Sequence, residues 1–317
     1  MTVFRAPGEV PAGFGPSVVA IGNFDGLHVG HREILRRVVA LARERGCVPT
    51  VLTFHPHPAR LLAPERAPKL IATLDQRLGR FAEVGIEAVL VQPFTLEFAS
   101  WTPGHFCQAI LADTLHARCI MVGGDFRFGY KQSGDVATLR AHGFEVLPVE
   151  EIGTAGIRAS STAIRALIAS GKVSRARRMM LAPFALEGLV VHGRGIGRKL
   201  TVPTLNLAAE NELLPATGVY VTRTRDEATN TRWASITNVG YRPTFGDGGL
   251  TVETYLLDPP PALFQADAPE RIEVEFLARV RGERKFDSPE ALKAQILRDA
   301  GAAQRFHRRA ADLPRVK

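Results

Sequence analysis

The stretch of residues 22–31, rich in glycine and histidine, constrains the fold of this chain more than any other feature. It follows the apolar run 17–21 and precedes a segment with helical periodicity that begins near His31. This order predicts a buried strand, a glycine-rich turn and a helix. Glycines let a backbone approach an anion closely, and the positive end of the helix dipole faces that anion. The segment therefore predicts a phosphate-binding site.

Two histidines, His28 and His31, stand three residues apart across this turn and add donors that can carry charge. With the glycines they can hold a triphosphate and stabilise the charge that grows when its α-phosphorus is attacked. That chemistry is nucleotidyl transfer. Two interpretations compete with it: glycine-rich turns after strands are common, and a histidine pair of this spacing also suits a metal ion.

The first half of the chain alternates apolar runs with helical patterns. The predicted strands lie at residues 18–21, 48–54, 87–91, 119–122 and 144–149. The predicted helices lie at 31–45, 74–84 and 106–115, and another opens within 159–170. This alternation is typical of a Rossmann-like α/β domain with a doubly wound parallel sheet, in which ligands bind beyond the carboxyl ends of the strands.

The sequence of residues 22–31, GNFDGLHVGH, resembles the signature of the nucleotidyltransferase superfamily, whose members carry an (H/T)xGH motif at the end of the first strand. In this form it looks like bacterial FAD synthetase. The resemblance implies that His28 and His31 are catalytic. It also implies that four further residues of the stretch bind the nucleotide: Gly22, Asn23, Phe24 and Gly30.

Residues 158–165, RASSTAIR, resemble the second signature of that superfamily, a serine-rich helix start that binds the triphosphate. Backbone donors and hydroxyls at a helix start suit phosphate oxygens, and the following arginine adds a planar, permanently charged donor pair. Taken alone, the same serines are an ordinary helix cap. The resemblance assigns five residues to the nucleotide: Arg158, Ser160, Ser161, Thr162 and Arg165.

Two other loops follow predicted strands. Asp125, in the turn 123–129, is a candidate for contact with the adenylate or with a metal, and the phenylalanines around it are equally consistent with plain packing. His57 and Pro58, in the sequence TFHPHP, resemble the flavin-side loop of FAD synthetase. A metal cluster is the alternative interpretation for five residues of these loops: His28, His31, His55, His57 and Asp125.

The pattern of apolar and polar residues changes near residue 182, and we place a boundary there between domains 1–182 and 183–317. The predicted strands after it are short and alternating, at 184–191, 218–223, 233–238, 251–257 and 272–280. Turns rich in Gly, Pro and Asp separate them. This pattern predicts an antiparallel β-barrel or sandwich, followed by a C-terminal helix at 288–300.

Residues 190–207 resemble the core of riboflavin kinase, which implies a riboflavin-kinase-like barrel. In that family a PTxN turn presents threonine and asparagine oxygens to Mg²⁺, which here means Thr204 and Asn206. Hard oxygen ligands are those that Mg²⁺ prefers. A glycine-rich loop lies over the ATP phosphates, and the resemblance assigns three of its residues to nucleotide binding: Gly193, Gly195 and Gly197.

Two later segments extend this resemblance. Residues 238–245 match the NxGxRPTF segment of the family, which places Arg242 at the flavin. Residues 251–258 match the strand that carries the catalytic base, which here is Glu253. The resemblance implies that Glu253 takes the proton of the ribityl 5′-hydroxyl as that hydroxyl attacks the γ-phosphate.

The chain also departs from the kinase pattern, which reads Leu-Gly-aromatic-Pro-Thr-Ala-Asn. Thr201, Val202 and Leu205 replace the glycine, the aromatic residue and the alanine. Loss of the glycine and gain of a bulky leucine would change the geometry of this loop. One alternative therefore stays open, namely an adenylyltransferase whose barrel only binds flavin, as a sensor or assembly module.

The composition bears on location and partners. No apolar run approaches the ~20 residues of a membrane helix, and no secretory signal is recognisable, so we expect a cytoplasmic protein. The 3 cysteines lack CxxC spacing and are expected to be buried thiols in a reducing compartment. A net charge of +8 suggests a nucleic-acid partner, but the charge is spread along the chain and the barrel lacks an aromatic-rich stacking sequence.

Together, the patterns predict a bifunctional enzyme of flavin cofactor synthesis. The second domain would phosphorylate riboflavin to FMN with ATP, and the first would adenylylate FMN to FAD with ATP. Mg²⁺ is implied in both reactions because the charge of the triphosphate must be neutralised. The expected partners are these small molecules, with no nucleic acid and no membrane, and the sequence indicates no oligomeric state.

Overall fold

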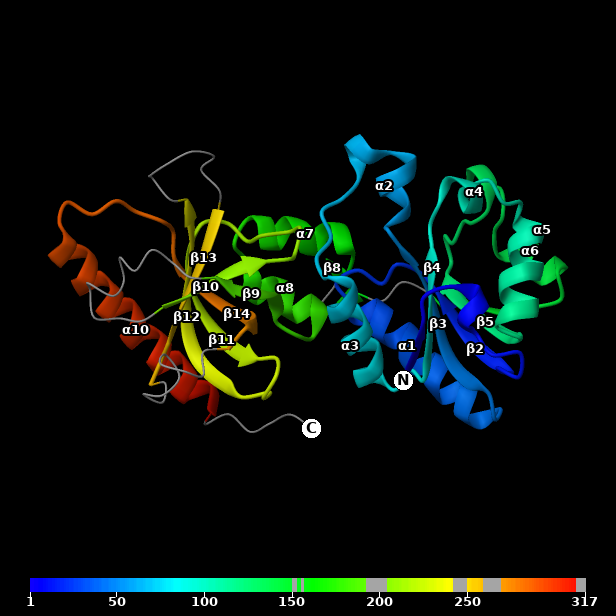
Figure 1. Ribbon diagram of the computed structural model, residues 1–317, viewed down its shortest axis with the longest axis horizontal. Coiled ribbons are helices and arrows are strands. Elements are labelled where there is room, and N and C mark those ends of the chain that lie inside the picture. Colours follow the sequence, from blue (N-terminus) through cyan, green and yellow to red (C-terminus); the bar gives the residue numbers. More distant parts are fainter. Residues whose placement is uncertain (150–152, 155–156, 192–203, 242–249, 259–268, 312–317) are drawn as a thin grey trace. The chain divides into compact units, whose positions relative to one another are not determined.

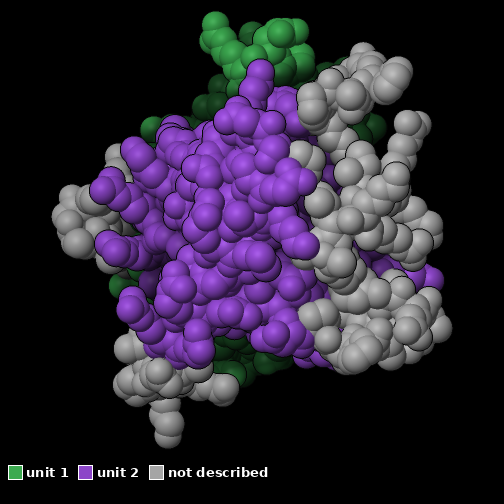
Figure 2. Space-filling model, turned by 90° about the vertical axis from the view of Figure 1, so that its left-hand side faces the viewer, with its two compact units in different colours: residues 1–161 green, residues 162–317 purple. Residues whose placement is uncertain are grey.

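The computed structural model describes residues 1–149, 153–154, 157–191, 204–241, 250–258 and 269–311 (Figure 1). Contacts divide the chain into two compact units, residues 1–161 and 162–317, coloured green and purple in Figure 2. Each unit has its own sheet and its own core, and each is described by itself.

The first unit is built on one sheet of parallel strands in the order β1-β4-β3-β2-β5-β6. Its strands are β1 (Thr2–Phe4), β2 (Ser17–Ile21), β3 (Val48–His55), β4 (Ala88–Pro93), β5 (Ala117–Gly123) and β6 (Glu145–Val149). The sheet confirms the predicted parallel α/β architecture. The structure adds β1, which is too short to give a sequence signal of its own.

Helices cover both faces of this sheet. They are η1 (Pro7–Glu9), α1 (Val29–Glu44), α2 (Pro58–Leu62), η2 (Pro64–Arg66), α3 (Leu74–Val84), α4 (Leu96–Ala99), α5 (Pro103–Phe106), η3 (Cys107–Thr114), η4 (Tyr130–Gln132) and α6 (Val136–Ala141). Figure 1 shows α1 and α3 on one face and α5 and α6 on the other. A small hairpin, β7 (Gly153–Thr154) and β8 (Ile157–Arg158), completes the unit.

The central strand β2 explains why the sheet is covered on both sides. All five of its residues are buried, and they alternate between two apolar layers. Val18 and Ala20 face the layer that contains α1 and α3, whereas Val19 and Ile21 face the layer of η3 and α6. A run that is apolar from residue 18 to residue 21 therefore folds as a strand buried on both faces.

The segment 106–115, predicted to be helical, is helical, and most of it is wound as a π-helix. A single turn, α5, leads into the π-helix η3, where the Leu115 N–H donates to the carbonyl of Ile110 at 2.9 Å. The hydroxyl of Thr114 likewise reaches back five residues to the carbonyl of Ala109 at 2.7 Å. Apolar spacing alone does not distinguish this wider winding from an α-helix.

The second unit is a closed antiparallel barrel in the order β10-β13-β12-β11-β14-β9, which confirms the predicted barrel. Its strands are β9 (Phe184–Val191), β10 (Thr204–Ala209), β11 (Gly218–Asp226), β12 (Arg232–Tyr241), β13 (Leu250–Leu256) and β14 (Arg271–Arg281). β10 was expected to be a loop and turn. It folds as a strand because Leu205 and Leu207 alternate inward while their neighbours face outward.

Within the described ranges of this unit the helices are α7 (Ser161–Ala169), α8 (Val173–Met180) and α10 (Pro289–Ala311). α10 lies along β11 and β12, as Figure 1 shows, and its Ala300 and Ala303 belong to an apolar cluster with residues of β11, β12 and β14. α8 packs against β9 and β14, where the Ser174 hydroxyl donates to the carbonyl of Leu277 at 3.0 Å. These contacts group α8 with the barrel. The domain boundary predicted between residues 182 and 183 stays a prediction.

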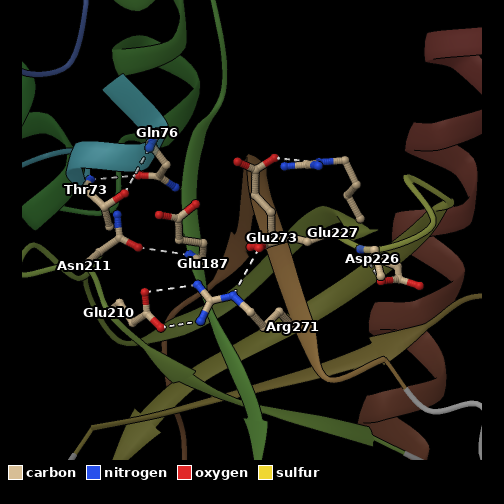
Figure 3. Close-up of polar contacts among 11 residues, drawn as sticks. Thr73, Gln76, Glu187, Glu210, Asn211, Asp226, Glu227, Arg271 and Glu273 are labelled. Atoms are coloured by element: carbon tan, nitrogen blue, oxygen red, sulfur yellow. Dashed lines mark hydrogen bonds and ion pairs between the residues drawn. The ribbon is translucent and has the colours of Figure 1, made fainter. Parts of the chain in front are cut away.

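Ion pairs tie together the ends of the barrel strands. Arg271, at the start of β14, donates to both carboxylate oxygens of Glu210 at 2.6 and 3.1 Å and to Glu227 at 3.1 Å (Figure 3). These carboxylates raise the pKa of Arg271. Because Glu210 follows β10 and Glu227 follows β11, one guanidinium joins three strand ends.

The barrel interior carries buried hydroxyls as well as apolar side chains. Thr222 contacts Ser235 at 2.8 Å and Thr237 at 2.7 Å, and Thr237 contacts Thr254 at 2.9 Å. All four side chains are 0% exposed. A buried hydroxyl is tolerated when it is hydrogen-bonded, so the network fixes how these strands pair.

This network generates a stability prediction. We expect Thr222→Val, which removes the central hydroxyl at nearly constant volume, to lower the free energy of unfolding by about 1–2 kcal/mol because its partners lose a hydrogen bond. Urea unfolding followed by the fluorescence of Trp233, in a Trp101→Phe background, reports on the barrel. A Val variant as stable as the parent would contradict the assigned role of the network.

Candidate functional site

The predicted nucleotide segments gather at one edge of the first unit's sheet. After β2 the chain adds β3 and β4 on one side, and it then returns to add β5 and β6 on the other side of β2. The winding direction thus changes between β2 and β5, which is where doubly wound sheets bind ligands. Residues 22–31 follow β2, residues 56–58 follow β3 and residues 124–129 follow β5, so three predicted segments share this edge.

The turn after β2 has a conformation that its glycines permit. Phe24, Gly26 and Leu27 have φ values of 50°, 75° and 33°. A Cβ on Gly26 would lie 2.7 Å from Cδ1 of Ile71, and a Cβ on Gly22 would lie 3.2 Å from the ring of Phe24. Larger residues at the two glycines would therefore displace the turn.

Buried contacts hold this turn in place. The carboxylate of Asp25, 3% exposed, accepts hydrogen bonds from the backbone N–H groups of Ile71 at 3.0 Å and Ala72 at 3.1 Å. The carbonyl of Asp25 accepts one from the Ser161 hydroxyl at 2.8 Å. Ser161, predicted to bind the triphosphate, thus connects the second signature to the first. The structural role of Asp25 was missed, although the residue lies inside the motif.

The two predicted catalytic histidines lie together at the start of α1. Their rings stack with centroids 3.6 Å apart and an interplanar angle of 21°. His28 is the N-cap of the helix, because its Nδ1 accepts a hydrogen bond from the backbone N–H of His31 at 3.4 Å. Phe24 contacts His31 edge-on, with centroids 5.2 Å apart. Gly30 is the second residue of α1, where backbone N–H groups have no partner within the helix.

Burial changes the charge state expected of these histidines. It lowers the pKa of His28 to about 4. It lowers the pKa of His31 well below its ordinary value, and the proximity of His28 lowers it further. Both imidazoles are therefore neutral near pH 7 in the free protein, where the sequence suggested donors that can be charged. A bound polyphosphate would raise both pKa values, because a nearby anion favours the protonated imidazole.

Two buried polar atoms of this site are unpaired within the part of the chain that the structure describes. They are Oδ1 of Asn23 and Nδ1 of His31. Buried polar groups are nearly always hydrogen-bonded in folded proteins, and the exceptions call for a ligand or a functional role. Both residues belong to the motif, so these atoms favour a ligand with hydrogen-bonding groups at the turn.

The remaining predicted residues of the first unit have mixed surroundings. Asp125 is exposed after β5, and the rings of Phe126 and Phe128 beside it stack with centroids 5.5 Å apart. His57 is the N-cap of α2, its Nδ1 accepting from the Ala59 N–H at 3.2 Å, and Pro58 is the first residue of that helix. The plain-packing interpretation thus holds for the phenylalanines, and Asp125 stays a candidate contact residue.

The second signature runs across the division between the units. Arg158 lies in β8, Ser160 follows it, and Thr162 and Arg165 lie on α7 in the second unit. Their contact with a nucleotide stays a prediction. Among the described residues no three His, Cys, Asp or Glu side chains are placed to share a metal ion, which includes the histidines of the alternative cluster.

An aromatic cluster that sequence analysis missed lies beside the same edge of the sheet. Phe54, near the end of β3, contacts Phe94 after β4, with centroids 5.9 Å apart, and Phe98 at 6.1 Å. Phe98 continues the series to Phe106, which contacts Phe128 at 5.3 Å. These rings are widely separated in sequence, so only the folded sheet brings them together.

The barrel sets two predicted kinase residues directly opposite one another and places a third on the same face. Asn206 on β10 stands directly opposite Glu253 on β13, which stands opposite Asn238 on β12. Directly opposed residues share a face, with Cβ atoms about 4.5–5.5 Å apart. Thr204 lies two residues before Asn206 and so projects to the same face of β10. The role of Asn238 was missed, because strand register is not visible in the sequence.

Thr204 and Asn206, the two residues predicted to hold Mg²⁺, lie on one face of β10. The hydroxyl of Thr204 and the amide oxygen of Asn206 are hard donors of the kind that Mg²⁺ prefers, so these residue types fit the ion. The departure at Leu205 does not disturb this face. Its side chain is 4% exposed and points to the opposite, interior side of β10, where it belongs to the barrel core.

Six residues of the kinase prediction lie outside the described part of the chain: Gly193, Gly195, Gly197, Thr201, Val202 and Arg242. The predicted cysteine environment holds for Cys107 and Cys119, which are buried, and burial raises the pKa of each thiol to about 11. Cys47 is only partly buried. No helix within the described ranges is long and apolar enough to span a membrane.

Known protein families match both the N-terminal and the C-terminal part of the chain. Residues 12–163 match the family described as FAD synthetase, and residues 180–307 match the family described as riboflavin kinase. The bifunctional riboflavin kinase/FMN adenylyltransferase of Escherichia coli K12 is 34% identical over 293 residues, which cover 91% of this chain and 92% of that protein. The enzyme of the same name from Bacillus subtilis is 31% identical and covers 92% of both chains.

A solved structure described as a macrolide-efflux protein from Streptococcus pneumoniae has the same fold throughout. It aligns with a TM-score of 0.83 and 28% identity over 96% of this chain and 98% of that chain. A doubly wound nucleotidyltransferase unit joined to a kinase-like barrel defines a two-unit, nucleotide-dependent transferase. The chain belongs to the family of bifunctional riboflavin kinase/FMN adenylyltransferases.

The lowered pKa of His28 predicts an acid-dependent loss of stability. The folded protein keeps this ring neutral down to pH about 4, whereas the unfolded chain protonates it near 6.5. Between these values the unfolded state binds more protons, so stability falls as the pH drops from 6.5 towards 4. At pH 5 this linkage costs the parent about 2 kcal/mol.

His28→Asn tests this linkage because asparagine retains an N-cap acceptor but does not titrate. We expect the variant to lose about 2 kcal/mol less stability than the parent between pH 7.5 and pH 5. Urea unfolding followed by Trp101 fluorescence, in a Trp233→Phe background, reports on the first unit. Equal losses in the two proteins would show that His28 is not the buried, neutral ring described above.

Proposed function

We propose that the second unit phosphorylates riboflavin to FMN with ATP and that the first unit adenylylates FMN to FAD with a second ATP. The family relationship supports both activities. The observation that carries the proposal is the placement of each chemical signature. The histidine–glycine turn lies where the sheet changes its winding direction, and the Thr204, Asn206 and Glu253 row lies on one barrel face.

In adenylyl transfer the residues of the first unit bind and neutralise the triphosphate. The free N–H groups at the start of α1, with Gly22, Asn23, Phe24 and Gly30, approach its oxygens. His28 and His31 donate to the phosphate as negative charge develops on the α-phosphoryl oxygens and the leaving pyrophosphate. Because both rings are neutral in the free site, the nucleotide itself raises their pKa values and recruits the protons.

The remaining candidate residues complete this nucleotide site by resemblance to the superfamily. They are Asp125, Arg158, Ser160, Ser161, Thr162 and Arg165. His57 and Pro58 would contact the flavin, and the aromatic cluster that starts with Phe54, at the end of the preceding strand β3, offers apolar side chains near them. We assign Arg242 to the flavin of the kinase reaction.

In phosphoryl transfer Glu253 accepts the proton of the ribityl 5′-hydroxyl as the oxygen attacks the γ-phosphate. Thr204 and Asn206 would hold Mg²⁺, and the loop with Gly193, Gly195 and Gly197 would cover the phosphates. When bound, the ion neutralises charge on the triphosphate. The carboxylate of Glu253 orients the hydroxyl, and Thr204 and Asn206 would hold the ion on the same barrel face.

Riboflavin, FMN and ATP are thus the proposed partners, and we place the protein in the cytoplasm, where these metabolites are made. The test is chromatography of the products formed from riboflavin, ATP and Mg²⁺. Formation of both FMN and FAD supports the proposal. If supplied FMN gives FAD while riboflavin stays unreacted, the barrel only binds flavin. If neither product forms, the proposal is wrong.

Two variants should separate the activities. We expect His31→Ala to reduce FAD formation from supplied FMN by at least about 100-fold, because a donor to the developing charge is lost. Glu253→Gln should reduce FMN formation by at least about 100-fold, because the base is lost. Each variant should retain the other activity within about twofold of the parent. A folded variant that loses both activities contradicts the assignment of one reaction to each unit.

A further inference from the structure

A buried arginine beneath the turn after β2 has no role in the mechanism above. Arg77, on α3, is 3% exposed. Its Nη1 donates to the carbonyl of Asn23 at 2.9 Å and to the hydroxyl of Thr53 at 3.3 Å. Its guanidinium thus joins α3, the end of β3 and the nucleotide turn.

The burial of this side chain is costly for folding. Desolvation lowers the pKa of Arg77, and the nearby carboxylate of Asp25 opposes that shift. Its Nε is buried without a partner among the described residues. Apolar side chains of similar volume usually stabilise such positions at least as well as a buried ion does. A stability role alone therefore explains poorly why an arginine occupies this position.

The hydrogen bond to Asn23 sets the direction of the next peptide group. In a trans peptide the C=O and the following N–H point in opposite directions. Because the Asn23 carbonyl points to Arg77, the N–H of Phe24 points away from it. That N–H has no hydrogen-bond partner within the described part of the chain. Phe24 has φ of 50°, and turns with such a residue can form concave anion-binding nests.

We propose that Arg77 is a positioning residue for adenylyl transfer. It orients the peptide between Asn23 and Phe24 so that the Phe24 N–H is presented to a phosphate oxygen of ATP, and its buried charge adds to the attraction for the triphosphate. The inference rests on the proposed function of the first unit. It predicts that substitutions of Arg77 weaken the binding of ATP in adenylyl transfer. They should change neither the binding of FMN nor the kinase activity of the second unit.

Three substitutions separate charge from hydrogen bonding. Arg77→Met removes both, Arg77→Gln keeps a short donor without charge, and Arg77→Lys keeps charge and a donor. We expect Met and Gln to raise KM for ATP in FAD formation about tenfold and Lys to restore it to within about threefold of the parent. KM for FMN and the rate of riboflavin phosphorylation should stay within about twofold. Calorimetry of ATP binding in the absence of FMN should rank the variants in the same order as their KM values for ATP.

The matched control is Arg80→Met on the same helix, where the arginine pairs at the surface with Glu83 at 3.5 Å. It should leave KM for ATP unchanged. If Arg77→Met does not fold, Arg77→Gln decides, with Trp101 fluorescence in a Trp233→Phe background as the control for folding of the first unit. A parental KM for ATP in Met and Gln variants, or equal rises for ATP and FMN, would overturn the inference. Parent protein that makes no FAD would instead overturn the proposed function, and the inference with it.

Discussion

The first unit depends on one topological constraint, which is that its strands are added on both sides of β2. The one polar side chain of this strand, Ser17, is buried and donates to the carbonyl of Leu115 at 2.5 Å, so the polar groups predicted to bind the nucleotide lie beyond the strand's end. There the turn at Phe24 adopts left-handed backbone angles that residues from other segments must hold. Asp25 binds the N–H groups of Ile71 and Ala72, and Ser161 binds the carbonyl of Asp25. The site is thus rigid because its anchors come from distant parts of the chain.

Burial of the two stacked histidines has a functional consequence. Charged rings 3.6 Å apart would repel one another, and the lowered pKa values keep both neutral in the free protein. The turn therefore carries no fixed histidine charge that would bind any small anion equally well. A polyphosphate with several negative charges can raise the pKa of both rings, whereas a singly charged anion does so less. This coupling favours triphosphates over simpler anions.

The sequence predicted the architecture and most of the candidate site residues because those features are local. The apolar run of β2, the glycines and the helical periodicity of α1 occur within one continuous segment. Arg77 gives no such signal, because an arginine on an amphipathic helix normally faces solvent. Arg77 is buried because the turn after β2 packs over it, and this contact forms only in the tertiary structure. The segment of η3 was predicted to be helical, but its π-type winding could not be predicted, since its apolar spacing is also consistent with an α-helix.

The barrel illustrates why departures from a family pattern must be judged by face. β10 alternates, so Leu205 and Leu207 fill the interior while Thr204 and Asn206 project outward. A larger residue at an interior position changes packing but leaves the outward oxygens in register with Glu253. The distance in sequence between Asn206 and Glu253 hides their pairing, which arises only when β10 and β13 form adjacent strands. We therefore expect substitutions on the outward face to affect the proposed catalysis and substitutions on the inward face to affect stability.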